Sequence, residues 1–322
     1  MKGFFRRPRA GQVRPDHPLV AVLLMTLACF CFASMDSVVR HIGAWLPAAL
    51  ILGIRFAFQT AVMTLWIGLG QGLSYHTRRP GLQCLRGLCL LGASGMAFYC
   101  LRSMPVAEFT AITLLAPVVV TLLASWLLRE QVPLWRWACV VGALVGALIV
   151  IRPGSGLFGW AVWFGLASTA FNVALQLITA KLASSEDSLT THFWTGASSA
   201  AVLLVVLLLG PLHLSDALAA VTLTQWAWML LLGVLSSTGH LLLIMAYSQT
   251  LASTLMPFSY MQLASAALVG WLAFGELPDG WGWLGMAVIA LCGAASAWMN
   301  VRAAAAAAAL EAQPALARSP SA

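Results

Sequence analysis

Long apolar runs alternate with short polar connections along almost the whole chain. The ten runs are 18–41, 48–69, 84–101, 106–128, 134–151, 158–181, 188–209, 225–247, 252–274 and 281–301. Each is close to the roughly 20 residues that a helix needs to cross a hydrocarbon core of about 30 Å. The runs are longer than barrel strands and lack their alternation, and a helix satisfies its own backbone hydrogen bonds in lipid. The pattern predicts an all-α integral membrane protein with ten transmembrane helices.

The composition leaves too little polar surface for a soluble domain. Of the 322 residues, 61% are hydrophobic and 8% are charged, and the mean hydropathy is +0.90. Soluble domains carry about 25% charged residues. The net charge of +7 is not gathered on a basic face with interleaved aromatic residues, so nucleic acid is not expected as a partner. We expect the lipid bilayer to cover most of the surface.

Lys and Arg are distributed unequally between alternate connections. One set of segments holds Lys2, Arg6, Arg7, Arg9, Arg14, Arg78, Arg79, Arg86, Arg129, Arg136, Lys181, Arg302 and Arg318. The other set holds Arg40, Arg102 and Arg152. Because positive residues accumulate on the cytoplasmic side, both termini are predicted to be cytoplasmic, in a bacterial inner membrane.

A short pattern that occurs twice indicates an internal repeat. Glu-x4-Trp-x-Trp begins at Glu130 and again at Glu276, 146 residues later. Two repeats of five helices, an odd number, must lie inverted relative to each other in the membrane. The predicted divisions are a basic tail (1–17), two five-helix repeats (18–152 and 157–302) and a disordered cytoplasmic tail (303–322). Inverted repeats are typical of secondary transporters, whose substrate site lies near the midplane between the repeats.

Two segments carry a family resemblance. Pro105–Gly154 has a small-residue helix with a central proline, then Arg-Glu, an aromatic pair and a glycine-rich helix, and Ala246–Trp298 looks like its second copy. These segments resemble the drug/metabolite transporter superfamily, in its EamA group of ten-helix carriers. The stretches around Asp36 and Arg55 resemble a branch that includes riboflavin and S-adenosylmethionine carriers. In the second copy Leu263 stands where Pro117 would recur, so the two halves are not expected to be equivalent.

Three charged residues fall within or beside the predicted spans. Asp36 and Arg55 are expected at similar depth in the first two helices, and Glu108 at the start of the fourth. Charges inside a membrane are costly and by default imply a functional site or a partner. Asp36 and Arg55 therefore form either a structural ion pair or a site for substrate or protons. Glu108 is either a solvated charge at the outer mouth or a coupling group.

Prolines and uncharged polar residues complete the candidate site. Pro117 is predicted to kink the centre of its helix, and Pro257 is either a second kink or a helix start. Polar residues at mid-depth are expected to share a cavity, because buried amides and hydroxyls need partners in lipid. In addition to the three charges, the candidates for substrate binding or coupling are Tyr99, Thr113, Asn172, Gln176, His240, Tyr260 and Gln262.

These observations favour a secondary transporter that moves a small polar metabolite by alternating access. The resemblance suggests an amino acid or derivative, riboflavin or S-adenosylmethionine as the solute. No GxxxxGK[ST] motif is present, so ATP is not expected to drive transport directly, and proton coupling and facilitated exchange both stay open. No cysteine or histidine cluster has metal-ligand spacing and no acid–base constellation occurs, so we expect neither a metal, a cofactor nor an enzyme. A sensor or assembly subunit without solute flux stays open as the alternative, as does a homodimer.

Overall fold

The computed structural model describes residues 18–70, 74–116, 119–120, 123, 134–152, 159–183, 185–209, 218–219, 221–249 and 255–316. Its elements are α1 (Pro18–Ile42), α2 (Ala48–Leu69), α3 (Pro80–Leu101), α4 (Val106–Thr113), α6 (Leu134–Ile151), α7 (Ala161–Leu182), α8 (Ser188–Leu209), α10 (Leu223–Gln249), the 3-10 helix η1 (Met256–Tyr260), α12 (Met261–Phe274) and α13 (Gly280–Leu316). All the described regular structure is helical. Six of these helices (α1, α2, α3, α7, α8 and α10) are long and apolar enough to cross a membrane. The prediction of an all-α multi-pass membrane protein is therefore confirmed.

Several helices differ from their predicted runs. α4 ends at Thr113, within the run predicted as 106–128. α3 begins at Pro80, four residues before the predicted start at residue 84, because proline is well placed in the first turn of a helix. The run 252–274 is divided, since η1 precedes α12. α13 continues beyond residue 302 to Leu316, so the tail predicted to be disordered from 303 is helical for this length. The run of alanines in this segment favours the extension, because alanine has the highest helix propensity of any residue.

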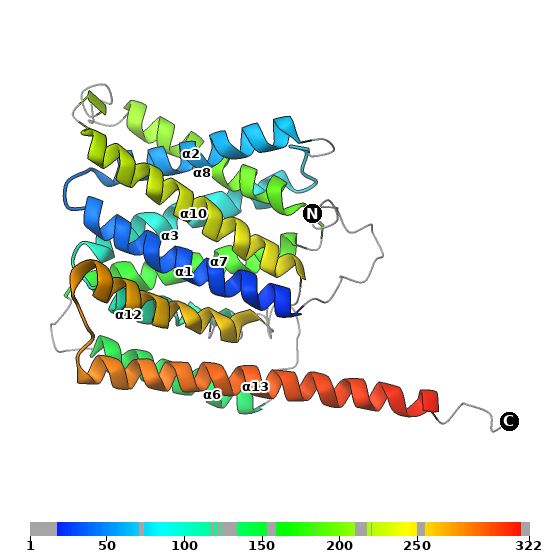
Figure 1. Cartoon of the computed structure of the whole chain (residues 1–322). Coiled ribbons are helices and arrows are strands. Elements are labelled where there is room, and N and C mark those ends of the chain that lie inside the picture. The colour runs from blue at the N-terminus through cyan, green and yellow to red at the C-terminus, as the bar shows by residue number, and fades with distance from the viewer. Residues whose placement is uncertain are drawn as a thin grey trace.

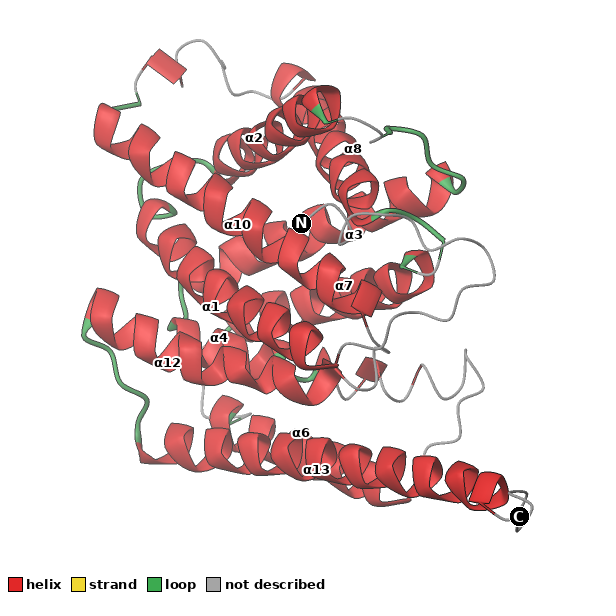
Figure 2. Ribbon diagram, turned by 45° about the vertical axis from the view of Figure 1, so that its right-hand side comes forward, coloured by secondary structure: helices red, strands yellow, loops and turns green. Residues whose placement is uncertain are grey.

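The helices lie roughly side by side, and Figure 1 shows how they are arranged. α2 and α8 pack together at one edge of the bundle, and α6 and α13 pack together at the opposite edge. Between these edges, α1 packs against α10 and α12, while α7 packs against α3 and α4. Figure 2 shows the same arrangement turned by 45°. Every described helix therefore contacts at least one helix that is distant in sequence.

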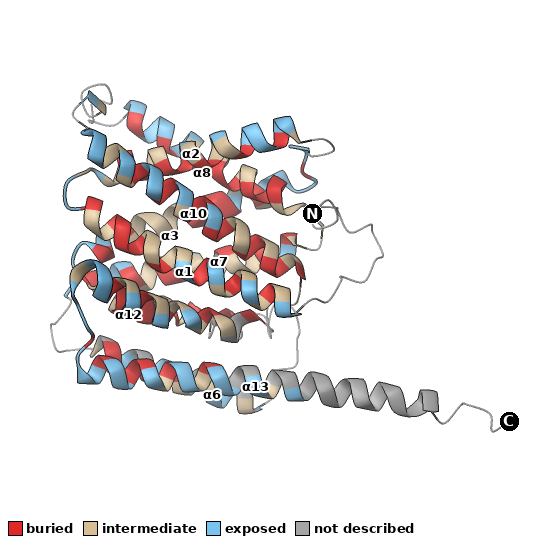
Figure 3. Cartoon of the chain, in the orientation of Figure 1, coloured by how far each residue is buried: buried red, intermediate tan, exposed pale blue. Residues whose placement is uncertain are grey.

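Burial is concentrated on the central helices (Figure 3). One apolar cluster contains Val39 of α1, Leu101 of α3 and Phe109 of α4. A second contains Met25 of α1 and Leu243 of α10. Large apolar side chains are exposed on the outer faces of α8, α12 and α13, as expected for surfaces that meet lipid tails. The two clusters lie toward opposite ends of α1.

Two ion pairs connect helices at the end of the bundle where α1 ends, here called the Arg40 end. Arg40 of α1 forms a bidentate ion pair with Glu276, which follows α12. Arg152, which follows α6, lies 2.8 Å from Asp279, which precedes α13. The opposite end, where α3 begins, is here called the Arg78 end. The Arg40–Glu276 pair connects elements more than 230 residues apart in sequence.

Candidate functional site

A cavity of about 120 Å³ lies between the two apolar clusters. Side chains from α1, α2, α3, α4, α7, α10, η1 and α12 line it. Val39 and Leu101 belong to its lining and to the cluster at the Arg40 end, whereas Met25 and Leu243 belong to the lining and to the other cluster. Apolar walls with a few polar groups are typical of small-molecule sites. The volume is below the 300–1,000 Å³ or so of drug-sized pockets, so it suits a small solute.

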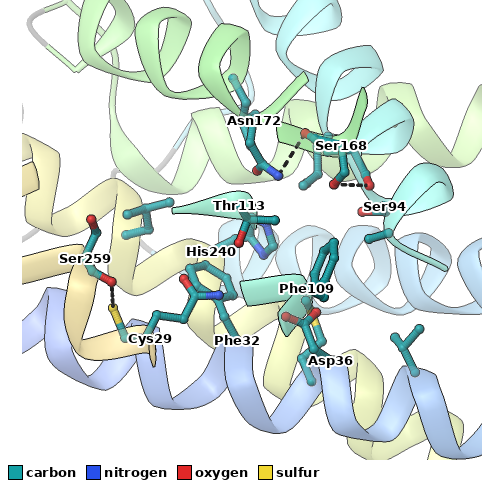
Figure 4. A pocket seen from close by; sticks show the side chains of 18 of the residues that line it. Cys29, Phe32, Asp36, Ser94, Phe109, Thr113, Ser168, Asn172, His240 and Ser259 are labelled. Carbon is teal, nitrogen blue, oxygen red and sulfur yellow. Dashed lines mark hydrogen bonds between the residues drawn. The ribbon is translucent and has the colours of Figure 1, made fainter. Parts of the chain in front are cut away.

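Asp36 places a carboxylate in this cavity. It lies on α1 and is 4% exposed, and Figure 4 shows its oxygens facing the space shared with His240 and Thr113. Among the residues that the structure describes, no hydrogen bond or direct ion pair to the Asp36 carboxylate is present. Its electrostatic partner is the Arg55 guanidinium. Asp36 is therefore a buried acid whose oxygens are available to a ligand.

Arg55 on α2 supplies the opposite charge and is 2% exposed. Its Nε donates to the Ser236 hydroxyl on α10 at 2.5 Å, and its Nη1 donates to the Ser94 hydroxyl on α3 at 3.0 Å. Its Nη2 is buried and has no hydrogen-bond partner in the described part of the chain. Since the bonded partners are neutral, the guanidinium keeps its positive charge and a free Nη2 group for an anionic ligand.

Ser236 connects Arg55 to His240. The Nδ1 atom of His240 lies 2.9 Å from the Ser236 carbonyl oxygen. The imidazole also meets the Phe32 ring edge-on, with 4.8 Å between the ring centroids. Both rings line the cavity. Because a carbonyl oxygen can only accept, Nδ1 carries the proton in the neutral imidazole and donates it to Ser236. Nε2 is then a hydrogen-bond acceptor.

Three amides and the Thr113 hydroxyl add to the polar lining. Asn172 donates to the Ser168 carbonyl oxygen at 3.1 Å, so its own carbonyl oxygen is available to the cavity. Gln176 accepts from the Tyr247 hydroxyl at 3.2 Å, which leaves its NH₂ group available. Gln262 and Thr113 also line the cavity. These groups supply donors and acceptors around the two charges.

The cavity thus unites many of the predicted candidates, namely Asp36, Arg55, Thr113, Asn172, Gln176, His240 and Gln262. Three other candidates lie outside the lining. Tyr99 is 48% exposed and packs against Phe98 and Phe164. Glu108 lies near the charges of the Arg40 end, with one buried oxygen that has no partner among the described residues. Tyr260 packs against Gly293 of α13.

The two prolines have different outcomes. Pro257 lies in η1, at the start of the segment that leads into α12, so it is placed as a helix-start residue. A kink within α12 is therefore not its role. Pro117 lies outside the described residues.

A buried polar layer that the sequence did not reveal lies toward the Arg78 end. Arg86, counted above among the cytoplasmic connections, is fully buried within α3. Gln59 of α2 contacts His192 of α8, and His192 in turn lies 3.0 Å from the Ser237 hydroxyl on α10. The signal that could have identified Arg86 is a charge inside an apolar run. The described residues contain no group of three or more side chains suited to a metal ion.

The comparisons with known proteins show what the chain resembles. Residues 19–152 match the EamA-like transporter family. The chain therefore carries an EamA-like transporter domain, and over most of its length it is similar to transporters of the drug/metabolite type. This EamA protein is a secondary transporter of small metabolites, and the relatives that it matches are transporters.

Several named relatives match over most of their length. A riboflavin transporter of Vibrio cholerae is 29% identical over 283 residues, which cover 85% of this chain and 92% of that protein. A pseudopaline exporter of Pseudomonas aeruginosa is 28% identical and covered to 89%. An S-adenosylmethionine uptake transporter of Rickettsia bellii is 26% identical and covered to 81%. One solved structure, titled only as the crystal structure of a protein, shares the fold with a TM-score of 0.64 at 18% identity, over 90% of this chain and 100% of the other.

Proposed function

We propose that this EamA protein carries a small zwitterionic metabolite, such as an amino acid or an amino-acid derivative. In this proposal Asp36 binds the cationic group of the solute and Arg55 binds its anionic group. Asn172, Gln176, His240, Gln262 and Thr113 bind the remaining polar atoms. The apolar walls, including Phe32, contact the rest of the solute.

The observation that carries this proposal is that Asp36 and Arg55 share one cavity without a direct ion pair between them. Two buried charges normally pair to offset their desolvation. Here the carboxylate faces the cavity and the guanidinium binds two serines, with its Nη2 group unused. A solute with an ammonium and a carboxylate satisfies both charges at once.

The helix contacts support transport by two inverted five-helix repeats, with repeat units at 18–152 and 157–302. The proposed repeats pair α1 with α7, α2 with α8, α3 with α10, α4 with α12, and α6 with α13. Under this pairing the α1–α10 contact corresponds to the α7–α3 contact, and the α1–α12 contact corresponds to the α7–α4 contact. The α2–α8 and α6–α13 contacts convert into themselves. In a protein with such a pseudo-twofold relation, the two repeats can exchange conformations. This gives one state that is open to one side of the membrane and a second state that is open to the other side. In this proposal the site lies between the two repeats, since helices of both line the cavity.

The distribution of charge supports an inner-membrane protein with cytoplasmic termini. The Arg78 end carries the exposed Arg78 and Arg79, whereas the Arg40 end carries the exposed Arg102 and two arginines, Arg40 and Arg152, that are paired with acids. Positive residues accumulate on the cytoplasmic side, so the Arg78 end faces the cytoplasm in this proposal. Asp36 is also the proposed proton-coupling group, because it is the carboxylate of the cavity lining.

The names of the relatives favour two solute chemistries. S-adenosylmethionine, named for the Rickettsia relatives, ends in an amino-acid group of the kind proposed here. Riboflavin, named for two relatives, is a planar heterocycle without such a group. The Phe32 and His240 rings in the lining make riboflavin the second candidate, because aromatic rings stack on flat ligands.

Binding to the purified chain tests the choice between these solutes. Thermal-shift or radioligand binding is measured for amino acids, S-adenosylmethionine and riboflavin. Each bound amino acid is then compared with its carboxamide and its N-acetyl form. We expect each modification to weaken binding by about tenfold or more, since a charge-assisted hydrogen bond contributes roughly 1.5–3 kcal/mol. Equal binding of the modified forms would contradict the zwitterion proposal, and binding of riboflavin alone would establish the second candidate.

A further inference from the structure

Arg86 is a buried cation without a described anionic partner. It lies in the second turn of α3 and is fully buried. Its Nε donates to the Thr179 hydroxyl of α7 at 2.8 Å, and its Nη1 donates to the Thr195 hydroxyl of α8. Its Nη2 is buried without a hydrogen-bond partner among the described residues. The guanidinium thus joins three helices and keeps a free donor.

The neighbours of Arg86 leave its charge uncompensated. Both threonine hydroxyls donate their own protons to carbonyl oxygens of their helices, at 2.6 Å for Thr179 and 2.7 Å for Thr195. The titratable side chains that interact electrostatically with Arg86 are Tyr247, Cys89, His192 and His240. None of a phenol, a thiol and an imidazole is an anion at neutral pH.

Glu186 and Asp187, the described acids of the same end, have other partners. Glu186 accepts from the Arg78 backbone N–H at 2.9 Å, and Asp187 accepts from two backbone N–H groups at the start of α8. In the part of the chain that the structure describes, neither forms an ion pair with Arg86. A buried unpaired charge is strongly unfavourable, so an anion from outside the protein is the partner that this environment lacks.

Arg86 lies next to the cavity but outside its lining. Leu90, one helical turn along α3, lines the cavity, and Tyr247 donates to the cavity residue Gln176. Ser94, which binds Arg55, is eight residues from Arg86, or about 12 Å along the helix at 1.5 Å per residue. Arg86 is therefore displaced from Arg55 by about two helical turns toward the Arg78 end.

We propose that Arg86 is a second anion-binding site, held by Thr179 and Thr195, which takes a small monovalent anion (a carboxylate or a halide) on the Arg78 side of the cavity. This site is separate from the solute position at Asp36 and Arg55, and it does not require the solute chemistry proposed above. Its ligand is either the carboxylate of a solute leaving the cavity or an inorganic anion. The two sources share one recognition chemistry, a guanidinium donor with flanking hydroxyls.

The test measures the melting temperature of the purified full chain in detergent by tryptophan fluorescence. Sodium chloride and sodium acetate are titrated separately against the bulky sulfonate HEPES at constant ionic strength. We expect a saturable rise of about 2 °C at ten times the half-saturating concentration, from the linkage of binding to unfolding. The variants are compared in an Arg55→Gln background, so that the cavity cation does not bind the anions. In that background Arg86→Gln abolishes the rise, and the exposed Arg78→Gln retains it.

The two titrations also distinguish the sources. A rise with acetate alone identifies a carboxylate site, and a rise with chloride alone identifies a halide site. Because one site is proposed, the two rises are not additive when both anions are present. Thr179→Val with Thr195→Val raises the half-saturating concentration several-fold, and it serves as the readout if Arg86→Gln does not fold.

Three results would overturn the proposal. The first is a wild-type melting temperature that shows no saturable dependence on either anion. The second is an unchanged rise of the melting temperature in Arg86→Gln. The third is a rise that is lost in Arg55→Gln but not in Arg86→Gln. A purely structural Arg86 would lower the melting temperature of its variant and leave the anion response intact. Since no solute flux is measured, failure here is independent of the proposed transport function.

Discussion

At the residue scale, the surroundings of Arg55 determine how the site can work. Its guanidinium joins α2 to α10 through Ser236 and to α3 through Ser94. Two of its nitrogens are thus committed to helix contacts, and Nη2 is available to a ligand. The same side chain therefore fixes the cavity wall and presents the positive charge. A planar five-donor fork can do both, and a lysine ammonium cannot.

Replacing Arg55 separates these two roles. Arg55→Lys keeps the charge but cannot reach both serines, so we expect its KM for solute flux to rise by about tenfold or more. Arg55→Gln removes the charge and is expected to abolish saturable flux. The matched control is Ser94→Ala, which removes one hydroxyl partner and leaves the charge. An unchanged KM in Arg55→Lys would show that the guanidinium does not bind the solute.

The sequence alone identifies the charged centre of the site, but it does not show which polar side chains point into the cavity. Asp36 and Arg55 stand out because a charge in an apolar run is rare. Tyr99 and Tyr260 were placed in the cavity incorrectly, since one is exposed and the other packs on Gly293. Lipid is as apolar as a protein core, so the pattern along a membrane helix does not reveal its inner face. Arg86 is counted with the cytoplasmic charges because it stands near the start of the predicted run 84–101, whereas α3 begins at Pro80 and places it in the second turn of the helix.

At the element scale, α6 and α13 pack through two glycines. A Cβ added to Gly285 would lie 2.5 Å from the Gly146 carbonyl oxygen and 2.6 Å from Val150. A Cβ added to Gly146 would lie 2.8 Å from the Gly285 carbonyl oxygen. Small residues allow membrane helices to approach this closely. The pair forms the edge of the bundle seen in Figure 1.

Gly285→Ala should therefore destabilise the protein. We expect a loss of about 1–3 kcal/mol in the free energy of unfolding, because the added methyl group forces two backbones apart. The control is Gly270→Ala in α12, where an added Cβ meets nothing within 4 Å. That change should be neutral or stabilising, since alanine favours helix over glycine by about 1 kcal/mol. Melting temperatures of both variants test this, and equal effects would contradict the packing account.

The Arg40–Glu276 pair offers a test of helix movement. Its side chains are 21% and 42% exposed, so the pair contributes about 0–1 kcal/mol to stability. If α1 and α12 separate at this end during transport, a disulfide between Arg40→Cys and Glu276→Cys stops the cycle. In a background without the seven native cysteines, we expect oxidation to arrest flux and reduction to restore it. Undiminished flux in the oxidised double variant, with normal flux in each single variant, would show that these ends stay together.

The elements themselves were largely predictable, and their interruptions were not. Apolar length identified α1, α2, α7 and α8 to within a few residues. The division of the run 252–274 into η1 and α12 depends on backbone geometry near Pro257, which hydropathy does not report. The extension of α13 reflects the propensity of its alanines rather than the thickness of a membrane.

At the scale of the whole molecule, the distribution of positive charge predicts the orientation. A C-terminal green fluorescent protein fusion should be fluorescent and a C-terminal alkaline phosphatase fusion inactive, because both termini are expected in the cytoplasm. Fusions after Ser103, at the Arg40 end, should give the reverse. An active phosphatase at the C-terminus would contradict the proposed orientation and exchange the two ends of the transport path.

Solute flux into proteoliposomes with an imposed pH gradient tests the central claim most directly. The panel contains amino acids, S-adenosylmethionine and riboflavin, and Asp36→Asn is the control because it removes the cavity carboxylate. The account predicts that a zwitterionic solute accumulates with the gradient. It also predicts that Asp36→Asn reduces flux by about tenfold or more, since a hydrogen bond to a charged group is worth roughly 1.5–3 kcal/mol, while its melting temperature stays close to that of the wild type. Absence of flux for every solute from well-folded protein, or equal flux in Asp36→Asn, would contradict it.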